Sequence, residues 1–156
     1  MSSTILWDGH SLDHAVLLSI RTHFVRKILD GSKNYELRRR IFSEPVGRSI
    51  LVYSSGEDKA VTVRGVVADV IEGTPDTVWR KLGNQLGLNR EEYFEYFGGS
   101  DIAYALELSQ ISALTDPVSL IEMRVCGLEP PQSWRYIRKD DHAEFFERLL
   151  PRCCGS

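Results

Sequence analysis

The stretch GSKNYELRRR, residues 31–40, follows a segment with helical periodicity and alternates in polarity as a β-strand does. Successive side chains of a strand point to opposite faces, so Glu36 and Arg38 share one face and can form an ion pair. Lys33 lies where the chain leaves the preceding helix, at the rim of any cavity that helix and strand enclose. The stretch therefore predicts three charged groups that converge on one site.

A simpler interpretation of this stretch is a helix end followed by an edge strand whose charged face is solvated. Charged side chains on edge strands are a common protection against aggregation. The residues alone leave both interpretations open.

The segments around this stretch predict blocks of strands and helices. Runs rich in apolar and β-branched residues predict strands at 14–21, 48–56, 60–73 and 101–114, and a proline-stiffened loop at 126–137 leads into a short strand. Helical periodicity predicts helices at 22–31, 76–87, 90–97 and 140–150.

Capping residues indicate where three of these helices begin or end. Thr22 is the expected N-cap of the first helix, and Gly31 is its expected left-handed C′ residue. Thr74, followed by a proline, starts the second helix. Asn89 and Glu92 are spaced as a capping box for the third helix.

The order of these elements predicts the fold class. Strand and helix do not alternate, which argues against a doubly wound sheet; five or six strands with helices gathered at the ends favour an α+β fold around a small mixed β-barrel. Pro117 is expected to end the 101–114 strand, because proline donates no backbone hydrogen bond. We expect one domain over 14–150, with tails at 1–13 and 151–156.

Bulk properties restrict the class of function. The net charge of −3 argues against a domain that coats nucleic acid nonspecifically, because such binding scales with the phosphates neutralised. The three cysteines form no disulfide framework or metal-ligand spacing, and the first ten residues lack the pattern of a signal peptide. We expect a cytoplasmic protein with no membrane partner, no cofactor and no metal, and either a monomer or a weak dimer.

The pattern G-x-K-x-x-E-x-R, formed by Gly31, Lys33, Glu36 and Arg38, resembles the sequence signature of the ASCH domain, a member of the PUA-like superfamily. Further blocks resemble the family in the same order, namely LLSIRTHFVRKILDG, LVYSSG, RGVVADVIEGTPDTVW, EEYFEYFGGSDIAYALEL and PPQSWRYI. The resemblance implies a small β-barrel with helices at its openings and a cleft near the first helix that holds the lysine, the glutamate and the arginine.

By analogy with PUA-like domains, the resemblance implies that the ligand is RNA or a modified nucleoside. The family includes RNA-binding modules, ribonucleases and an amidohydrolase that acts on N4-acetylcytidine. In that amidohydrolase branch, a threonine nucleophile holds the position of Glu36, and a glutamate precedes the helix that matches 90–97. This chain lacks both groups, because residues 82–89 contain no acid.

Our leading hypothesis is therefore a binding module for RNA or a nucleotide-like ligand, with a regulatory role as one option. A hydrolase, either an amidohydrolase or a ribonuclease, is the alternative, and a protein-interaction domain with a vestigial cleft is a third. A hydroxyl or a second carboxylate within hydrogen-bond distance of Lys33 would favour the hydrolase.

The chemistry of such a ligand selects the candidate site residues. Arg38 can hold a phosphate through two hydrogen bonds, Lys33 adds a point charge, and Glu36 can accept from the exocyclic amine of a base. Lys33 and Glu36 are also the candidate catalytic residues. The complete set of expected ligand-binding residues is Lys33, Glu36, Arg38, Tyr53, Ser54, Ser55, Trp134 and Tyr136. For the aromatic members, stacking on a base and packing in the core are the alternatives.

Overall fold

The structure, a computed structural model, describes residues 6–7 and 10–152. Its strands are β1 (Leu6–Trp7), β2 (His10–Ser11), β3 (Ala15–Arg21), β4 (Tyr35–Arg38), β5 (Ser49–Ser55), β6 (Ala60–Gly73), β7 (Ala103–Ser119) and β8 (Trp134–Ile137). Its α-helices are α1 (Thr22–Asp30), α2 (Pro75–Leu82), α3 (Arg90–Tyr96), α4 (Leu120–Val125) and α5 (Ala143–Leu149), and two 3₁₀ turns span Gly83–Gln85 and Leu150–Arg152.

A six-stranded mixed sheet in the order β4-β7-β6-β5-β3-β8 forms the centre of the fold. Only the β3–β5 pair is parallel; the other pairs in this sheet are antiparallel. The sheet curls until its two edges approach each other, since Arg38 on β4 donates to the carbonyl of Ser133, the residue before β8. The α+β, barrel-like fold that the sequence predicts is confirmed.

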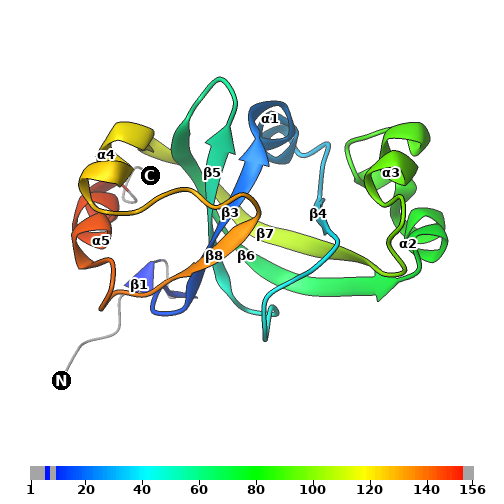
Figure 1. Ribbon diagram of the computed structural model, residues 1–156, viewed down its shortest axis with the longest axis horizontal. Coiled ribbons are helices and arrows are strands. Elements are labelled where there is room, and N and C mark those ends of the chain that lie inside the picture. Colours follow the sequence, from blue (N-terminus) through cyan, green and yellow to red (C-terminus); the bar gives the residue numbers. More distant parts are fainter. Residues whose placement is uncertain (1–5, 8–9, 153–156) are drawn as a thin grey trace.

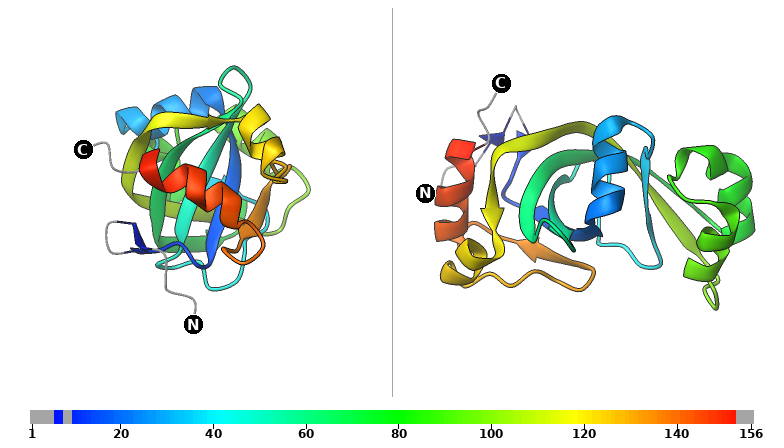
Figure 2. Two further views of the ribbon diagram at one scale, coloured as in Figure 1. Left: turned by 90° about the vertical axis from the view of Figure 1, so that its left-hand side faces the viewer. Right: turned by 90° about the horizontal axis from the view of Figure 1, so that it is seen from above.

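Helices cover the two openings of this curled sheet (Figures 1 and 2). The helices α4 and α5 lie at one end, where α5 crosses the opening, while α2 and α3 lie at the other end, at the tip of the long β6–β7 pair. Helix α1 packs beside the sheet next to β4. As a result, β4 lies between α1, which precedes the long strand pair in sequence, and α3, which belongs to the connection between β6 and β7.

Three apolar clusters hold these layers together. One joins the sheet to α4 and α5 and includes Leu17, Leu51, Met123, Phe145, Phe146 and Leu149. A second fills the other face of the same strands under α1 and includes Val16, Leu18, Val25, Ile28, Val52 and Val63. The third packs α2 and α3 against β4 and β7 and includes Leu37, Val78, Leu82, Tyr93, Phe97 and Ala105.

Most of the predicted helix ends are confirmed. Gly31 ends α1 in the left-handed conformation with φ +86°, Thr74 accepts from the backbone of Thr77 at the start of α2, and Asn89 forms the expected capping box. The prediction for Thr22 is wrong, because Arg21 is the N-cap of α1. The Thr22 hydroxyl instead bonds to the 54–55 end of β5.

The prediction that Pro117 ends the long strand is also wrong, since β7 continues to Ser119. Its register with β6 shifts there. Val63 pairs with Ala113, whereas Val61, two residues earlier on β6, pairs with Val118, five residues later on β7. Proline is tolerated in such a bulge because no ladder hydrogen bond is required of it.

Helix α4 was not predicted, although its start has a recognisable signal. Ser119 accepts from the backbone of Glu122 at 3.1 Å, the serine-x-x-glutamate spacing of a helix start. The helix has only six residues, too few to show a clear helical period.

The segment expected to be an N-terminal tail contains packed residues. Leu12 is 1% exposed and belongs to the core, while β1 pairs with β2. Residues 1–5 and 8–9 of that segment, and 153–156 of the expected C-terminal tail, lie outside the described residues. Among the helices of the part that is described, none has both the length and the apolar character required to cross a membrane.

Tyr93 makes stability depend on pH in the alkaline range. Its buried hydroxyl donates to the carbonyl of Pro75 at 2.7 Å, and burial raises its pKa to about 12. The unfolded chain ionises this group near pH 10, so the stabilisation is complete below pH 10 and is lost as pH rises through about 12. Urea unfolding of wild type and Tyr93→Phe from pH 8 to 12 should show wild type losing about 2–3 kcal/mol more than the variant. Parallel losses in the two proteins would contradict this.

Candidate functional site

Backbone contacts at the end of α1 place the charged stretch. After Gly31, the backbone N–H of Lys33 returns to the carbonyl of Lys27 at 3.1 Å, and Asn34 donates to Gln85 at 3.0 Å. The chain then enters β4, where Glu36 pairs with Leu106 of β7. These contacts orient one face of β4 toward the space between α1 and α3.

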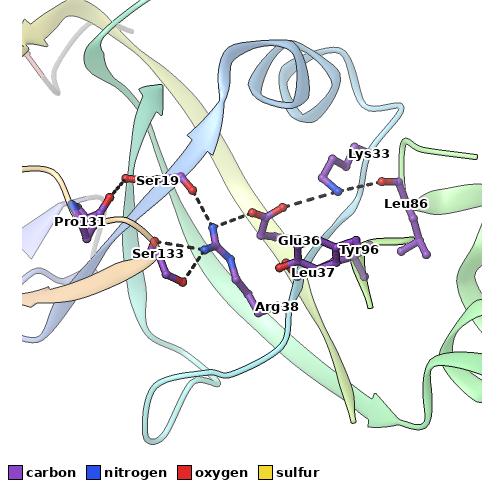
Figure 3. Close-up of polar contacts among 9 residues, drawn as sticks. All are labelled: Ser19, Lys33, Glu36, Leu37, Arg38, Leu86, Tyr96, Pro131 and Ser133. Carbon is purple, nitrogen blue, oxygen red and sulfur yellow. Dashed lines mark hydrogen bonds and ion pairs between the residues drawn. The ribbon is translucent and has the colours of Figure 1, made fainter. Parts of the chain in front are cut away.

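Lys33, Glu36 and Arg38 form a buried ion cluster on that face (Figure 3). The Lys33 Nζ lies 3.6 Å from Glu36 Oε1, and Arg38 Nη2 lies 2.8 Å from Glu36 Oε2. Their side chains are 3%, 9% and 8% exposed, respectively. The Lys33 ammonium also donates to the carbonyl of Leu86 at 2.8 Å. The charged groups therefore converge as the sequence predicts, and the solvated edge strand is not what the chain forms.

The guanidinium of Arg38 is largely occupied by protein acceptors. Nη1 donates to the carbonyl and the hydroxyl of Ser133 at 3.2 and 3.1 Å, and Nη2 donates to the carbonyl of Ser19 at 3.0 Å as well as to Glu36. Arg38 therefore ties β4 to β3 and to the loop before β8 and fixes the carboxylate of Glu36. Its Nε is buried with no hydrogen-bond partner among the described residues.

The electrostatics of this cluster favour a partner that carries negative charge. Burial lowers the pKa of the Lys33 ammonium, and the neighbouring carboxylate of Glu36 opposes this change. With Lys33 protonated, two cations face one anion, which leaves a net charge of +1 on three side chains that are each less than one-tenth exposed. A buried charge is costly unless it is paired, so an anionic group in the adjoining space would be stabilised.

A cleft with a volume of about 520 Å³ lies over the cluster. Its floor is β4, and its walls carry one aromatic ring from α1 and one from α3, Phe24 and Tyr96. The Lys33 Nζ lies 5.0 Å from the ring centre of Phe24, and the guanidinium of Arg39 lies 4.8 Å from that of Tyr96. The other lining residues are Ser19, Ile20, Arg21, His23, Glu36, Leu37, Arg38, Ser55, Leu88, Glu92, Glu95, Gln132 and Ser133.

Four of the eight expected site residues line this cleft: Lys33, Glu36, Arg38 and Ser55. Tyr53 is instead part of the core cluster under α4 and α5. Ser54 is fully buried, bonds to the Thr22 hydroxyl at 2.9 Å and donates to Asp58 at 2.8 Å. Both residues therefore have structural contacts that explain their positions.

The two remaining residues, Trp134 and Tyr136, also lie outside the cleft. Their rings meet edge to face with centroids 5.4 Å apart. The Tyr136 hydroxyl accepts from the backbone of Ser43 at 3.1 Å, and its ring lies 5.4 Å from the guanidinium of Arg48. Trp134 lines a separate groove next to the cleft.

Sequence reasoning missed the contribution of α3 to the cleft. Glu92, Glu95 and Tyr96 are spaced three and four residues apart, which places them on one helix face. That spacing can be read from the sequence. The position of α3 next to β4 cannot, because it is set by the long β6–β7 pair that carries the helix. Glu92 and Glu95 therefore add two carboxylates to the lining of the cleft, and Oε1 of Glu92 accepts from the backbone of Asn89 at 3.1 Å.

The contacts of Lys33 and the positions of possible metal ligands bear on the hydrolase alternative. The contacts described for the Lys33 ammonium are with Leu86, Glu36 and the ring of Phe24, so the additional hydroxyl or carboxylate expected of a hydrolase is not among them. Within residues 6–7 and 10–152, no group of three or more histidine, cysteine, aspartate or glutamate side chains could hold a metal ion.

Gly87 is expected to be essential for the position of Lys33. It has φ +76°, and an added Cβ would lie 2.9 Å from the Cβ of Lys33. Gly87→Ala should lose about 1–2 kcal/mol from the backbone conformation and a further amount from displacement of Lys33, measured by urea unfolding. Gly99→Ala is the matched control, because Gly99 has φ +82° with nothing within 4 Å of its added Cβ. Equal losses in the two variants would show that Lys33 does not need this space.

The curled mixed sheet, the helices at its openings and the charged cleft beside the first helix define a barrel-like PUA-like domain. Residues 14–128 match the family model described as "Domain of unknown function (DUF365)". The chain belongs to this family and, as its relatives show, to the ASCH domain proteins, so the resemblance seen in the sequence is confirmed.

The similar proteins agree in sequence and in fold. An "ASCH domain-containing ribonuclease" from Zymomonas mobilis is 27% identical over 127 residues, which cover 80% of this chain and 85% of the relative. The crystal structure of ASCH from Zymomonas mobilis matches with a TM-score of 0.77 at 25% identity, over 85% of this chain and 94% of that one. The N-terminal domain of Staphylothermus marinus McrB shares the fold more distantly, with a TM-score of 0.53 at 15% identity over 88% and 93% of the chains.

Proposed function

We propose that this ASCH-domain chain binds RNA, or a nucleotide-like ligand, and that one nucleotide occupies the cleft over β4. The observation that carries this proposal is the convergence of Lys33, Glu36 and Arg38 beneath a cleft of about 520 Å³. That volume lies within the range of about 300–1,000 Å³ typical of small-ligand pockets. The name of the Zymomonas mobilis relative, a ribonuclease, supports RNA as the ligand.

The floor of the cleft offers adjacent hydrogen-bonding groups to the edge of a base. A carboxylate has about four acceptor positions and an ammonium has three donors. The described partners of Glu36 are Lys33 and Arg38, and the described hydrogen bond of Lys33 is to Leu86. Capacity therefore remains on both groups for a base, and the rings of Phe24 and Tyr96 provide stacking faces.

The phosphate is expected to contact exposed arginines rather than Arg38, whose role is to position Glu36. Arg21 and Arg39 line the mouth of the cleft and are exposed. Glu92 and Glu95 line the α3 side, where they would repel phosphate. We therefore place the backbone of the RNA on the arginine side and its base toward β4.

Anisotropy titrations of fluorescein-labelled single-stranded RNA test this function. Removal of two phosphate contacts in Arg21→Ala/Arg39→Ala should weaken binding about 10- to 100-fold. The control Arg80→Ala/Lys81→Ala removes the same charge from exposed positions on α2, outside the cleft, and should change affinity less than twofold. Equal weakening in both double variants, or no weakening in either, would contradict RNA binding in the cleft.

RNA cleavage is a second candidate function, and two observations favour it. One is the name of the relative, and the other is the lowered pKa of Lys33 beside a fixed carboxylate, which makes this pair suited to proton transfer. Incubation with 5′-labelled single-stranded RNA should then yield fragments that Glu36→Gln does not produce. A parallel incubation with N4-acetylcytidine tests the amidohydrolase alternative. If both substrates stay intact, hydrolysis is excluded for them and RNA binding remains the proposed function.

We also propose a cytoplasmic location. Cys126 is a free thiol, which is the usual state of cysteine in a reducing compartment.

A further inference from the structure

A second hollow, the outer groove, continues the cleft along the same side of the molecule. It has a volume of about 860 Å³ and shares Arg39, Tyr96, Gln132 and Ser133 with the cleft. Beyond these shared residues it is lined by Arg40, by residues 100–102, by Tyr104 and by Trp134. The two hollows therefore meet across Arg39 and Tyr96 without an intervening element.

The outer groove repeats the chemistry of the cleft. Tyr104 and Trp134 are half-buried aromatic side chains that line it, as Phe24 and Tyr96 line the cleft. The ring of Trp134 is fixed edge to face against Phe42, with centroids 5.5 Å apart. A rigid ring beside an exposed arginine is the combination with which proteins bind successive nucleotides of a single strand.

Consecutive arginines connect the two hollows. Arg39 lines both of them, whereas Arg40 lines only the outer groove. Both side chains are exposed, so each is available to a phosphate. A chain whose phosphate lies over Arg39 can therefore place one base in the cleft and the next base in the outer groove.

We propose that the cleft and the outer groove form one path for single-stranded RNA, which holds at least two consecutive nucleotides with their shared phosphate at Arg39. This inference rests on the proposed function and adds the class of substrate and its minimal length. It excludes duplex RNA, because Glu36 lies at the bottom of the cleft with 9% of its side chain exposed, and a base must leave its stack to contact it.

The test compares RNAs of different length and strandedness on the same protein. The probes are the four nucleoside 5′-monophosphates, the four homotrinucleotides, and a labelled decamer as a single strand or as a blunt duplex. Stacking of a second base should make the best trinucleotide bind about tenfold or more tighter than its monophosphate. The duplex should bind at least tenfold more weakly than the single strand. The recovered RNA is run on a denaturing gel so that only intact probes are compared.

The variant Arg40→Ala separates the outer groove from the cleft. It should weaken trinucleotide binding about threefold to tenfold, lower the salt slope of log affinity by about 0.7, and leave monophosphate binding unchanged. Arg80→Ala on α2 is the control and should alter none of these quantities.

The possible outcomes distinguish this inference from the proposed function. Equal affinity for trinucleotide and monophosphate, with both lost in Arg21→Ala/Arg39→Ala, would overturn the path and leave the cleft in place. Preference for the duplex would also overturn the path. No binding of any RNA would overturn both.

Discussion

Glu36→Ala is expected to lower the free energy of unfolding by about 3–5 kcal/mol, the largest stability effect of any single change considered for this chain. The variant leaves Lys33 and Arg38 buried without their shared anion, and the cost of an unpaired buried charge exceeds that of a missing contact. Urea unfolding followed by circular dichroism measures the change.

The control for this change is Glu129→Ala, which breaks an ion pair of similar length on the surface. Glu129 lies 3.0 Å from Arg124, with side chains that are 64% and 57% exposed. Solvent screening limits its contribution to about 1 kcal/mol or less. A loss of that size in Glu36→Ala would mean that water compensates the charges of Lys33 and Arg38, which would contradict a buried ion cluster that depends on Glu36.

Glu36→Gln is expected to weaken binding of single-stranded RNA about 10- to 100-fold, the largest functional effect of a substitution that preserves shape. The amide can still accept from Arg38 through its oxygen, but it then presents N–H groups to Lys33 and to the cleft. A base donor that faced a carboxylate now faces another donor, and a good paired contact to a base edge contributes about 1–3 kcal/mol. Isothermal titration calorimetry on the folded variant measures the loss.

Glu95→Gln provides the matched comparison within the same cleft. Glu95 is exposed on α3, opposite the arginines, so the same chemical change there removes repulsion of phosphate. Its affinity for RNA should equal or exceed that of wild type. If Glu36→Gln and Glu95→Gln behave alike, the base does not contact the floor of the cleft.

The parts of the fold that the sequence predicts well depend on short-range chemistry. Gly31 can adopt a positive φ at little cost, and Asn89 satisfies the first N–H groups of α3, so both helix boundaries follow from one residue and its neighbours. The alternation of β4 likewise places Glu36 and Arg38 on one face. These features need no knowledge of distant segments.

The site residues that the sequence misplaced depend on contacts between distant segments. Tyr53 alternates onto the face of β5 that α4 and α5 cover, and α4 was itself not predicted. Trp134 lies one position beyond Ser133, whose carbonyl holds Arg38, so a single step along the chain moves it from the cleft to the outer groove. Tyr96 reaches the cleft only because the β6–β7 pair is long enough to return α3 to β4.

The buried cluster of Lys33, Glu36 and Arg38 can serve either stability or ligand recognition. Replacing a buried ion group by apolar residues is often neutral or stabilising, so the cluster is weak evidence for a purely structural role. Its position beneath an open cleft, with donor and acceptor capacity left on Lys33 and Glu36, is the arrangement expected of a recognition site.

Photo-crosslinking tests the central claim most directly. Single-stranded RNA that contains 4-thiouridine is irradiated in complex with the full chain, and the crosslinked peptides are sequenced by mass spectrometry. We predict crosslinks at Phe24 and Tyr96, the two aromatic walls of the cleft. Crosslinks confined to α4 and α5, at the opposite end of the curled sheet, would contradict the account.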